Sequence, residues 1–204
     1  SRNALEGPLK GLRVVDAGNM IAGPLAATLL ADFGADVVKL EQPGVGDPMR
    51  HWTPVKEDHS LWWKVIARNK RLITLNLSAP KGQELLRRLI VNADILIENY
   101  RPGTFERWGL GYDVLSAINR RLVFVRVSGY GQTGPYRNRG GYGTITEAFS
   151  GVPSFTGFPD KPPTLPGFPM ADSVAATFAA MAAMFAVYDR DHHEPHCGQE
   201  IDVS

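Results

Sequence analysis

The stretch LRVVDAGNMIAGPLAATLLADFGADVVKLE, residues 12–41, decides the fold of this chain. Its apolar, β-branched run Leu12–Ala17 predicts a strand, and Asp36–Glu41 predicts a second one. Between them, Gly23-Pro24 suits a first helical turn, apolar residues follow at helical spacing, and Gly34 stands where a helix would end. Residues 12–41 therefore predict one strand–helix–strand unit of the usual length of about 30 residues.

The same alternation continues along the chain. Helices are expected to open at Pro80 and at Asp172, the latter running to about Asp189. Further strands are expected at Ile73–Leu77, Asp94–Tyr100, Leu122–Val127 and Gln199–Val203. Strands that alternate with helices are typical of a parallel sheet covered by helices, so the expected fold class is α/β.

Composition excludes several classes of partner. The chain has 204 residues, 44% of them hydrophobic, and a formal net charge of +1, which gives no whole-chain field toward nucleic acid or an anionic membrane. No apolar run approaches the roughly 18 uninterrupted residues of a membrane span, and the first residues lack the apolar core of a signal peptide. A single cysteine, Cys197, cannot form an internal disulfide, so a cytoplasmic location is expected.

Two patterns suit a nucleotide-like ligand. The turn Gly18–Gly23 follows the first strand as a dinucleotide-binding turn does, although its glycine spacing is incomplete, and Glu41 ends the second strand where a ribose-binding acid would lie. An ordinary turn, a surface acid and solvated surface charges are the simpler interpretations. Positive charge gathers at Arg68, Lys70 and Arg71, at Arg101 and Arg107, and at Arg137 and Arg139. The second and third groups follow the fourth and fifth predicted strands, so together they could face a phosphorylated ligand.

Two further segments carry reactive residue types. HHEPHC, residues 192–197, contains metal-ligating side chains, but Pro195 breaks any helix and the spacing fits no standard zinc pattern, so a turn without a metal is expected. Asp172 precedes an apolar run and suits a helix N-cap. The same position would also suit a nucleophile, because a helix N-terminus favours an ionised carboxylate and apolar surroundings exclude water. The residues alone leave both interpretations open.

Six strings, in order, resemble one known family. They are LKGLRVVD through Arg50 (residues 9–50, including AGP at 22–24), RNKRLITLNL (68–77), PKGQELLRRL (80–89), ENYRPG (98–103), SGYGQTGP (128–135) and GQEIDVS (198–204). Together they resemble the N-terminal half of family III CoA-transferases, the group that contains formyl-CoA and carnitine CoA-transferases. The likeness extends over nearly the whole chain.

The resemblance implies an α/β fold with a Rossmann-like, mostly parallel sheet and helices on both faces. Residues 1–190 would be a CoA-binding large domain, and residues 191–204 the start of a linker toward a second domain that this chain lacks. Members of the family form interlocked dimers of chains about twice this length. The expected partners are therefore a second copy, as an interlocked homodimer, or a complementary second chain fragment.

The resemblance also implies a chemistry. Asp172, in PMADSVAA, falls on the catalytic aspartate, which forms an aspartyl anhydride and then an aspartyl-CoA thioester while CoA passes from an acyl-CoA to a small carboxylic acid. A CoA thioester would be a substrate, and no cofactor would be permanently bound. Tyr142 matches a tyrosine beside that aspartate in some members.

Other positions carry over to CoA itself. The family's CoA-binding residues fall on Leu75, Asn99, Tyr100 and Arg107, whereas Gln42 stands where some members place an arginine. Ile21 replaces a glutamine of the formyl-CoA transferase oxalyl site, so oxalate is not expected as an acceptor.

Two alternatives stay open. One is an enzyme similar to α-methylacyl-CoA racemases, although those have a His-Asp pair after a glycine where this chain has Tyr142-Gly143, and neither residue suits acid–base work. The other is a non-catalytic module that binds CoA or a nucleotide.

Overall fold

The sheet carries the topology of a doubly wound α/β protein. A computed structural model describes residues 7–204, so the first six residues of the predicted large domain lie outside it. Six strands lie in the order β5-β2-β1-β6-β7-β8, and every neighbouring pair is parallel. They are β1 (Arg13–Asp16), β2 (Asp36–Glu41), β5 (Lys70–Thr74), β6 (Ile95–Glu98), β7 (Val123–Val127) and β8 (Glu200–Val203). The α/β prediction is confirmed.

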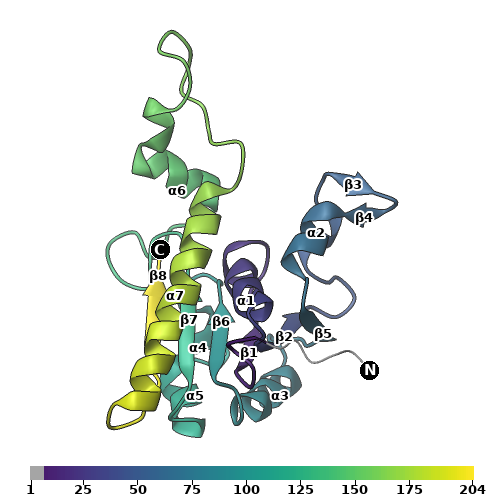
Figure 1. Ribbon diagram of the computed structural model, residues 1–204, viewed down its shortest axis with the longest axis vertical. Coiled ribbons are helices and arrows are strands. Elements are labelled where there is room, and N and C mark those ends of the chain that lie inside the picture. Colours follow the sequence, from purple (N-terminus) through teal and green to yellow (C-terminus); the bar gives the residue numbers. More distant parts are fainter. Residues whose placement is uncertain (1–6) are drawn as a thin grey trace.

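Helices cover both faces of the sheet (Figure 1). On one face lie α1 (Ala22–Asp32) and the long α7 (Met170–His192), which contact each other. The other face packs against α3 (Pro80–Ile90), α4 (Thr104–Arg107) and α5 (Tyr112–Ile118). Both faces of the central strands are therefore buried, as expected of a parallel sheet, while the edge strand β5 is largely exposed.

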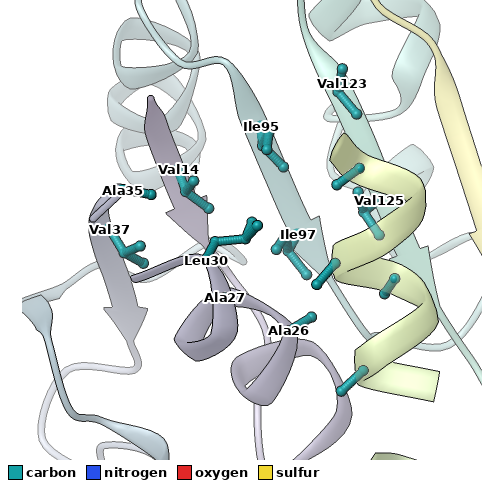
Figure 2. Close-up of a cluster of buried hydrophobic side chains, with 14 of the residues drawn as sticks. Val14, Ala26, Ala27, Leu30, Ala35, Val37, Ile95, Ile97, Val123 and Val125 are labelled. Atoms are coloured by element: carbon teal, nitrogen blue, oxygen red, sulfur yellow. The ribbon is translucent and has the colours of Figure 1, made fainter. Parts of the chain in front are cut away.

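Alternation along β1 places its side chains in two cores. Val14 packs with α1 and α7, while Val15 packs with the helices of the opposite face. Figure 2 shows the first core, in which Val14 and Ile97 lie next to Leu30 of α1 and Val125 lies next to α7. The small buried residues of α7 let it approach closely; they are Ala176, Ala179, Ala180, Ala183 and Ala186.

Several short elements project beyond the sheet and its covering helices (Figure 1). On one side are the 3₁₀ turn η1 (Pro48–His51), the hairpin β3 (Val55–Lys56) with β4 (His59–Ser60), and α2 (Leu61–Ile66). Above α7 lie α6 (Gly143–Ser150) and η2 (Val152–Phe155), followed by an irregular loop to residue 169. None of these short helices and strands was predicted from the sequence.

The structure corrects several predicted boundaries. The third strand of the chain's parallel sheet is β5, Lys70–Thr74, three residues earlier than the predicted Ile73–Leu77. β5 can begin at Lys70 because the buried Lys70 ammonium pairs with Asp16. The predicted domain boundary after residue 190 falls inside α7, and β8 beyond it is hydrogen-bonded to β7, so residues 200–203 belong to the sheet.

α7 also bears on the membrane question. By length and composition alone, this 23-residue helix would suffice to cross a membrane. Its alanine face packs on α1 and β7, which is how the core helix of a folded domain behaves.

Candidate functional site

The loops at the carboxyl edge of the sheet line one large cavity. This main cavity has a volume of about 1480 Å³ and also takes in α6, the first half of α7 and the end of β8. A smaller cleft of about 130 Å³ lies beside it and shares Asn19, Gln42 and Tyr100 with it. Ligands of doubly wound sheets bind at this edge.

The turn after β1 is tied to the loop after β6. The side-chain oxygen of Asn99 accepts from the backbone N–H of Asn19 at 2.8 Å, and its side-chain nitrogen donates to the carbonyl of Asn19 at 2.8 Å. A Cβ at Gly23 would lie 3.3 Å from the Asn99 side chain, which explains a small residue there. The predicted CoA-binding Asn99 therefore also fixes the turn 18–23.

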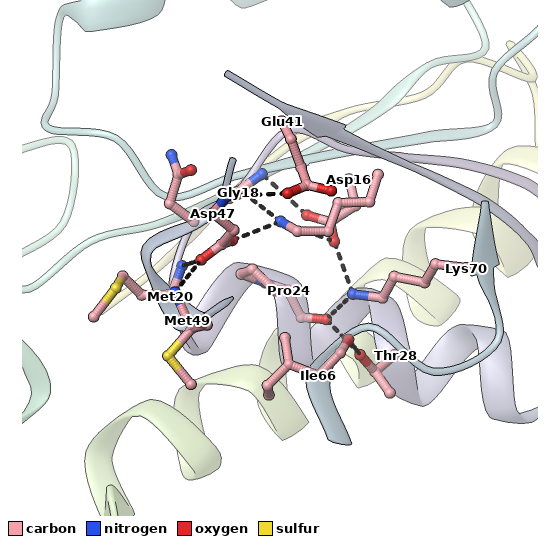
Figure 3. A network of polar contacts seen from close by, with 12 residues as sticks. Asp16, Gly18, Met20, Pro24, Thr28, Glu41, Asp47, Met49, Ile66 and Lys70 are labelled. Atoms are coloured by element: carbon pink, nitrogen blue, oxygen red, sulfur yellow. Dashed lines mark hydrogen bonds and ion pairs between the residues drawn. The ribbon is translucent and has the colours of Figure 1, made fainter. Parts of the chain in front are cut away.

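Buried ions support this turn from below (Figure 3). The Lys39 ammonium donates to the carbonyl of Gly18 at 2.8 Å and pairs with Asp47 at 2.9 Å. The Lys70 ammonium pairs with Asp16 at 2.8 Å. Burial alone would raise the pKa of Asp16, but the two lysines hold it below its usual value, so the carboxylate is ionised.

The structure corrects the predicted surface cluster of Arg68, Lys70 and Arg71. Lys70 was expected in a surface cluster and is instead buried, while its neighbours pair with carboxylates, Arg68 with Asp32 and Arg71 with Asp36. A lysine at the start of a strand looks like surface charge in the sequence, because the acid that pairs with it, Asp16 of β1, lies two strands away in the sheet.

Glu41 is not a surface acid, because Arg50 holds it in a buried ion pair. Its side chain is buried, and both of its oxygens accept from Arg50, at 2.7 and 2.8 Å. One of them also accepts from the backbone N–H of Asp47 at 3.0 Å. The pKa of Glu41 lies below its usual value because Arg50 outweighs the effect of burial. Arg50 and Asp47 thus occupy three of the about four lone-pair sites of this carboxylate, which also lines the smaller cleft.

The remaining arginines differ in whether they line the main cavity. Arg101, Arg137 and Arg139 line the main cavity, and Arg139 lies over the ring of Tyr136 at 3.9 Å. Arg107 is exposed, donates to the hydroxyl of Thr104 at 3.0 Å and lines neither cavity.

The remaining predicted CoA-binding residues gather at the smaller cleft. Leu75, Gln42 and Tyr100 line it together with Trp108. Tyr100 is half-buried and meets Trp108 edge to face, with ring centroids 5.2 Å apart. The cleft is thus a small slot with an aromatic wall and polar side chains at Asn19, Gln42 and Ser78, a combination suited to a flat heteroaromatic group with hydrogen-bonding edges.

Asp172 is not the N-cap of α7. That position is Pro169, with no side-chain cap, and Asp172 lies in the first turn, so the N-cap interpretation is wrong. Burial first, and the charge of Glu147 second, raise the pKa of Asp172 to about 6. The favourable helix N-terminus is outweighed by these two effects.

Gly143 is the closest neighbour of this carboxylate from α6. A Cβ added to Gly143 would lie 2.2 Å from Oδ2 of Asp172, so only glycine leaves room for the side chain as it stands. Tyr142, the predicted neighbour, is 75% exposed and lines the same cavity.

The histidine-rich segment forms the expected turn. The ring of His192 stacks on Tyr188 at 4.1 Å, and His193 pairs with Asp189 at 2.9 Å. Across residues 7–204, no three His, Cys, Asp or Glu side chains gather as metal ligands would.

A sequence model of CoA-transferase family III matches residues 9–204. The chain belongs to this family. It is 50% identical over 197 residues to succinyl-CoA–D-citramalate CoA-transferase of Chloroflexus aurantiacus, covering 96% of this chain and 48% of that relative. It is 38% identical to succinyl-CoA:glutarate CoA-transferase of Mus musculus, covering 90% of this chain and 42% of that relative.

A solved structure agrees with this family assignment. A CAIB/BAIF family protein from Brucella suis superimposes with a TM-score of 0.91 at 36% identity, over 97% of this chain and 53% of that one. This family III chain spans about half the length of the curated relatives it matches.

Proposed function

We propose that this chain supplies the nucleophile and most of the CoA-binding surface of an enzyme that transfers CoA from an acyl-CoA to a carboxylic acid. One observation carries the proposal: a desolvated carboxylate, Asp172, lines a cavity that also holds three arginines. The fold and family support the same activity.

The proposed reaction begins at the Asp172 carboxylate. Its oxygen attacks the thioester carbonyl, the C–S bond breaks, and a mixed anhydride and CoA thiolate result. The thiolate attacks the aspartyl carbonyl, which releases the donor acid and leaves an aspartyl-CoA thioester. The acceptor carboxylate then attacks this thioester, and the liberated thiolate takes the acyl group from the new anhydride, restoring Asp172.

The cavity suits both parts of such a substrate. The smaller cleft at Leu75, Gln42 and Tyr100 would take the adenine, with Asn99 and Arg107 near the phosphates and the pantetheine arm reaching Asp172. Arg101, Arg137 and Arg139 offer positive charge to phosphates or to a second carboxylate. Because relatives are named for succinyl-CoA, succinyl-CoA with small dicarboxylic acids is the first pair to test.

Racemisation fits the site less well. The Asp172 oxygen occupies the space of a side chain at residue 143, where the racemase pattern would need an aspartate. All five histidines lie in the described part of the chain, and none of them lines the main cavity. Among the described residues that line the cavity, the His-Asp pair of the racemase pattern is therefore missing.

The assembly and the cellular location are also proposed. We propose that the chain forms an interlocked homodimer, or pairs with a complementary second chain fragment, in the cytoplasm. Exposed aromatic side chains along α6, the loop after it and α7 support a protein cover, because monomers rarely expose such surface. They are Phe149, Phe155, Phe158, Phe168, Phe178, Phe185 and Tyr188.

Trapping tests the proposed nucleophile. The natural full-length protein, incubated with succinyl-CoA and then hydroxylamine, should carry a hydroxamate at Asp172, found by peptide mass spectrometry, because anhydrides and thioesters both react with hydroxylamine. Asp172→Asn should carry none and should lose at least about a thousandfold in turnover, as expected for a covalent nucleophile. Near-normal turnover of Asp172→Asn would reject the assignment. Deuterium entering the acyl α-carbon without an acceptor would favour racemisation.

A further inference from the structure

Glu147 is a buried carboxylate that the proposed reaction does not use. It lies on α6 with only 4% of its surface exposed, and Oε1 accepts from the backbone N–H of Ala171 at 2.9 Å. Ala171 immediately precedes Asp172. The acceptor that satisfies this N–H in the first turn of α7 therefore comes from another helix, since the N-cap residue Pro169 provides none.

One face of α6 meets the nucleophile at two points. Gly143 and Glu147 are four residues apart in one helix and so lie on the same face. Gly143 leaves the space that the Asp172 carboxylate fills, and Glu147 anchors the backbone one residue earlier. We propose that Glu147 is a positioning residue, which holds the first turn of α7 so that Asp172 rests against Gly143 and which faces Asp172 with a like charge.

The charge has a consequence beyond anchoring. Among the described residues, no cation pairs with Asp172, and after burial it is Glu147 that raises its pKa. The other titratable groups that line the main cavity are Tyr100, Arg101, Tyr130, Arg137, Arg139, Tyr142 and Asp202. Two acids so arranged keep part of the Asp172 population protonated near neutral pH, and an ionised Asp172 is a stronger nucleophile than an ordinary aspartate.

Two substitutions separate anchor from charge. Glu147→Gln keeps an oxygen that accepts from Ala171 and removes the charge, whereas Glu147→Ala removes both. This proposal rests on Asp172 as the nucleophile. We expect the acidic limb of kcat/KM, near pH 6 in the natural protein, to move to lower pH in Glu147→Gln while KM for acyl-CoA changes less than about threefold. Glu147→Ala should lower kcat about tenfold or more at every pH, because the first turn is released.

A control and a second readout keep the outcomes distinct. Glu84→Gln removes an exposed carboxylate of α3 and should leave the profile unchanged. Titration of the Asp172 carboxyl carbon by NMR reads its pKa without turnover and should show a lower value in Glu147→Gln. An unchanged titration in that variant would overturn the proposal for Glu147. Absence of the hydroxamate at Asp172 in the natural protein would instead reject the proposed function.

Discussion

Different interactions stabilise the two walls of the main cavity. The wall below the turn 18–23 stands on ion pairs of Asp16, Lys39 and Lys70, whose side chains are completely buried. The opposite wall, formed by α6 and α7, displays aromatic side chains such as Phe149 and Phe178, 64% and 54% exposed. The first wall is held rigid by this chain itself, whereas the second rests on the contact between two helices. The binding end is therefore preorganised, and the reacting end is the part that a small change can displace.

The largest expected effect comes from breaking the rigid wall. Asp16→Asn removes the acid that pairs with Lys70 and faces Lys39, so the buried Lys70 ammonium loses its carboxylate partner while Lys39 keeps Asp47. We expect a loss of about 3–5 kcal/mol in the free energy of unfolding, because an uncompensated buried charge is costly. Urea denaturation measures it.

An exposed ion pair from the same sheet provides the control. Asp36→Asn breaks the pair with Arg71, whose partners are half or more exposed. Such surface pairs are worth about 0–1 kcal/mol. Equal urea midpoints for Asp16→Asn and Asp36→Asn would show that the buried network does not support the wall.

The second effect tests the movable wall. Gly143→Ala places a Cβ 2.2 Å from Oδ2 of Asp172, so the carboxylate must rotate away. Because a displacement of about 1 Å can cost about a hundredfold in rate, we expect kcat to fall by about that factor while the affinity for CoA is retained. Steady-state kinetics and calorimetry with CoA measure the two quantities.

Gly167→Ala is the matched glycine control. It lies in the loop before α7, where an added Cβ meets no atom within 4 Å, and should leave kcat unchanged. If Gly143→Ala keeps normal kcat, the Asp172 carboxylate does not react from the position described above.

Elements with a repeating pattern could be predicted from the sequence, whereas short elements and isolated charges could not. Apolar alternation in residues 12–41 predicted β1, α1 and β2 because each element repeats a short pattern along the chain. The strands of the β3–β4 hairpin have two residues each, too few to show any period. Lys70 was misplaced because a single charge gives no sign of the acid that will face it across the sheet.

The site residues also differ in whether the sequence could reveal them. Asp172 could be found because it stands in a recognisable string at the start of an apolar helix. Glu147 gave no signal, since its role depends on the packing of α6 against α7 and on the N–H of Ala171, 24 residues away. A glutamate in a short helix otherwise predicts a solvated surface.

The smallest expected effect concerns Arg107 and its contribution to CoA affinity. Arg107 is exposed and outside both cavities, so its contact with CoA would be a single ionic hydrogen bond to a phosphate rather than part of the enclosed slot. Such bonds are worth about 1.5–3 kcal/mol, so Arg107→Ala should weaken CoA binding by about ten- to a hundredfold in calorimetry. Arg88→Ala, an exposed arginine of α3, is the control for general loss of positive charge. Comparison with 3′-dephospho-CoA locates the contact: if the substitution no longer matters for that ligand, Arg107 binds the 3′-phosphate, and if it matters equally, the pyrophosphate. Unchanged affinity for CoA itself would remove Arg107 from the binding surface.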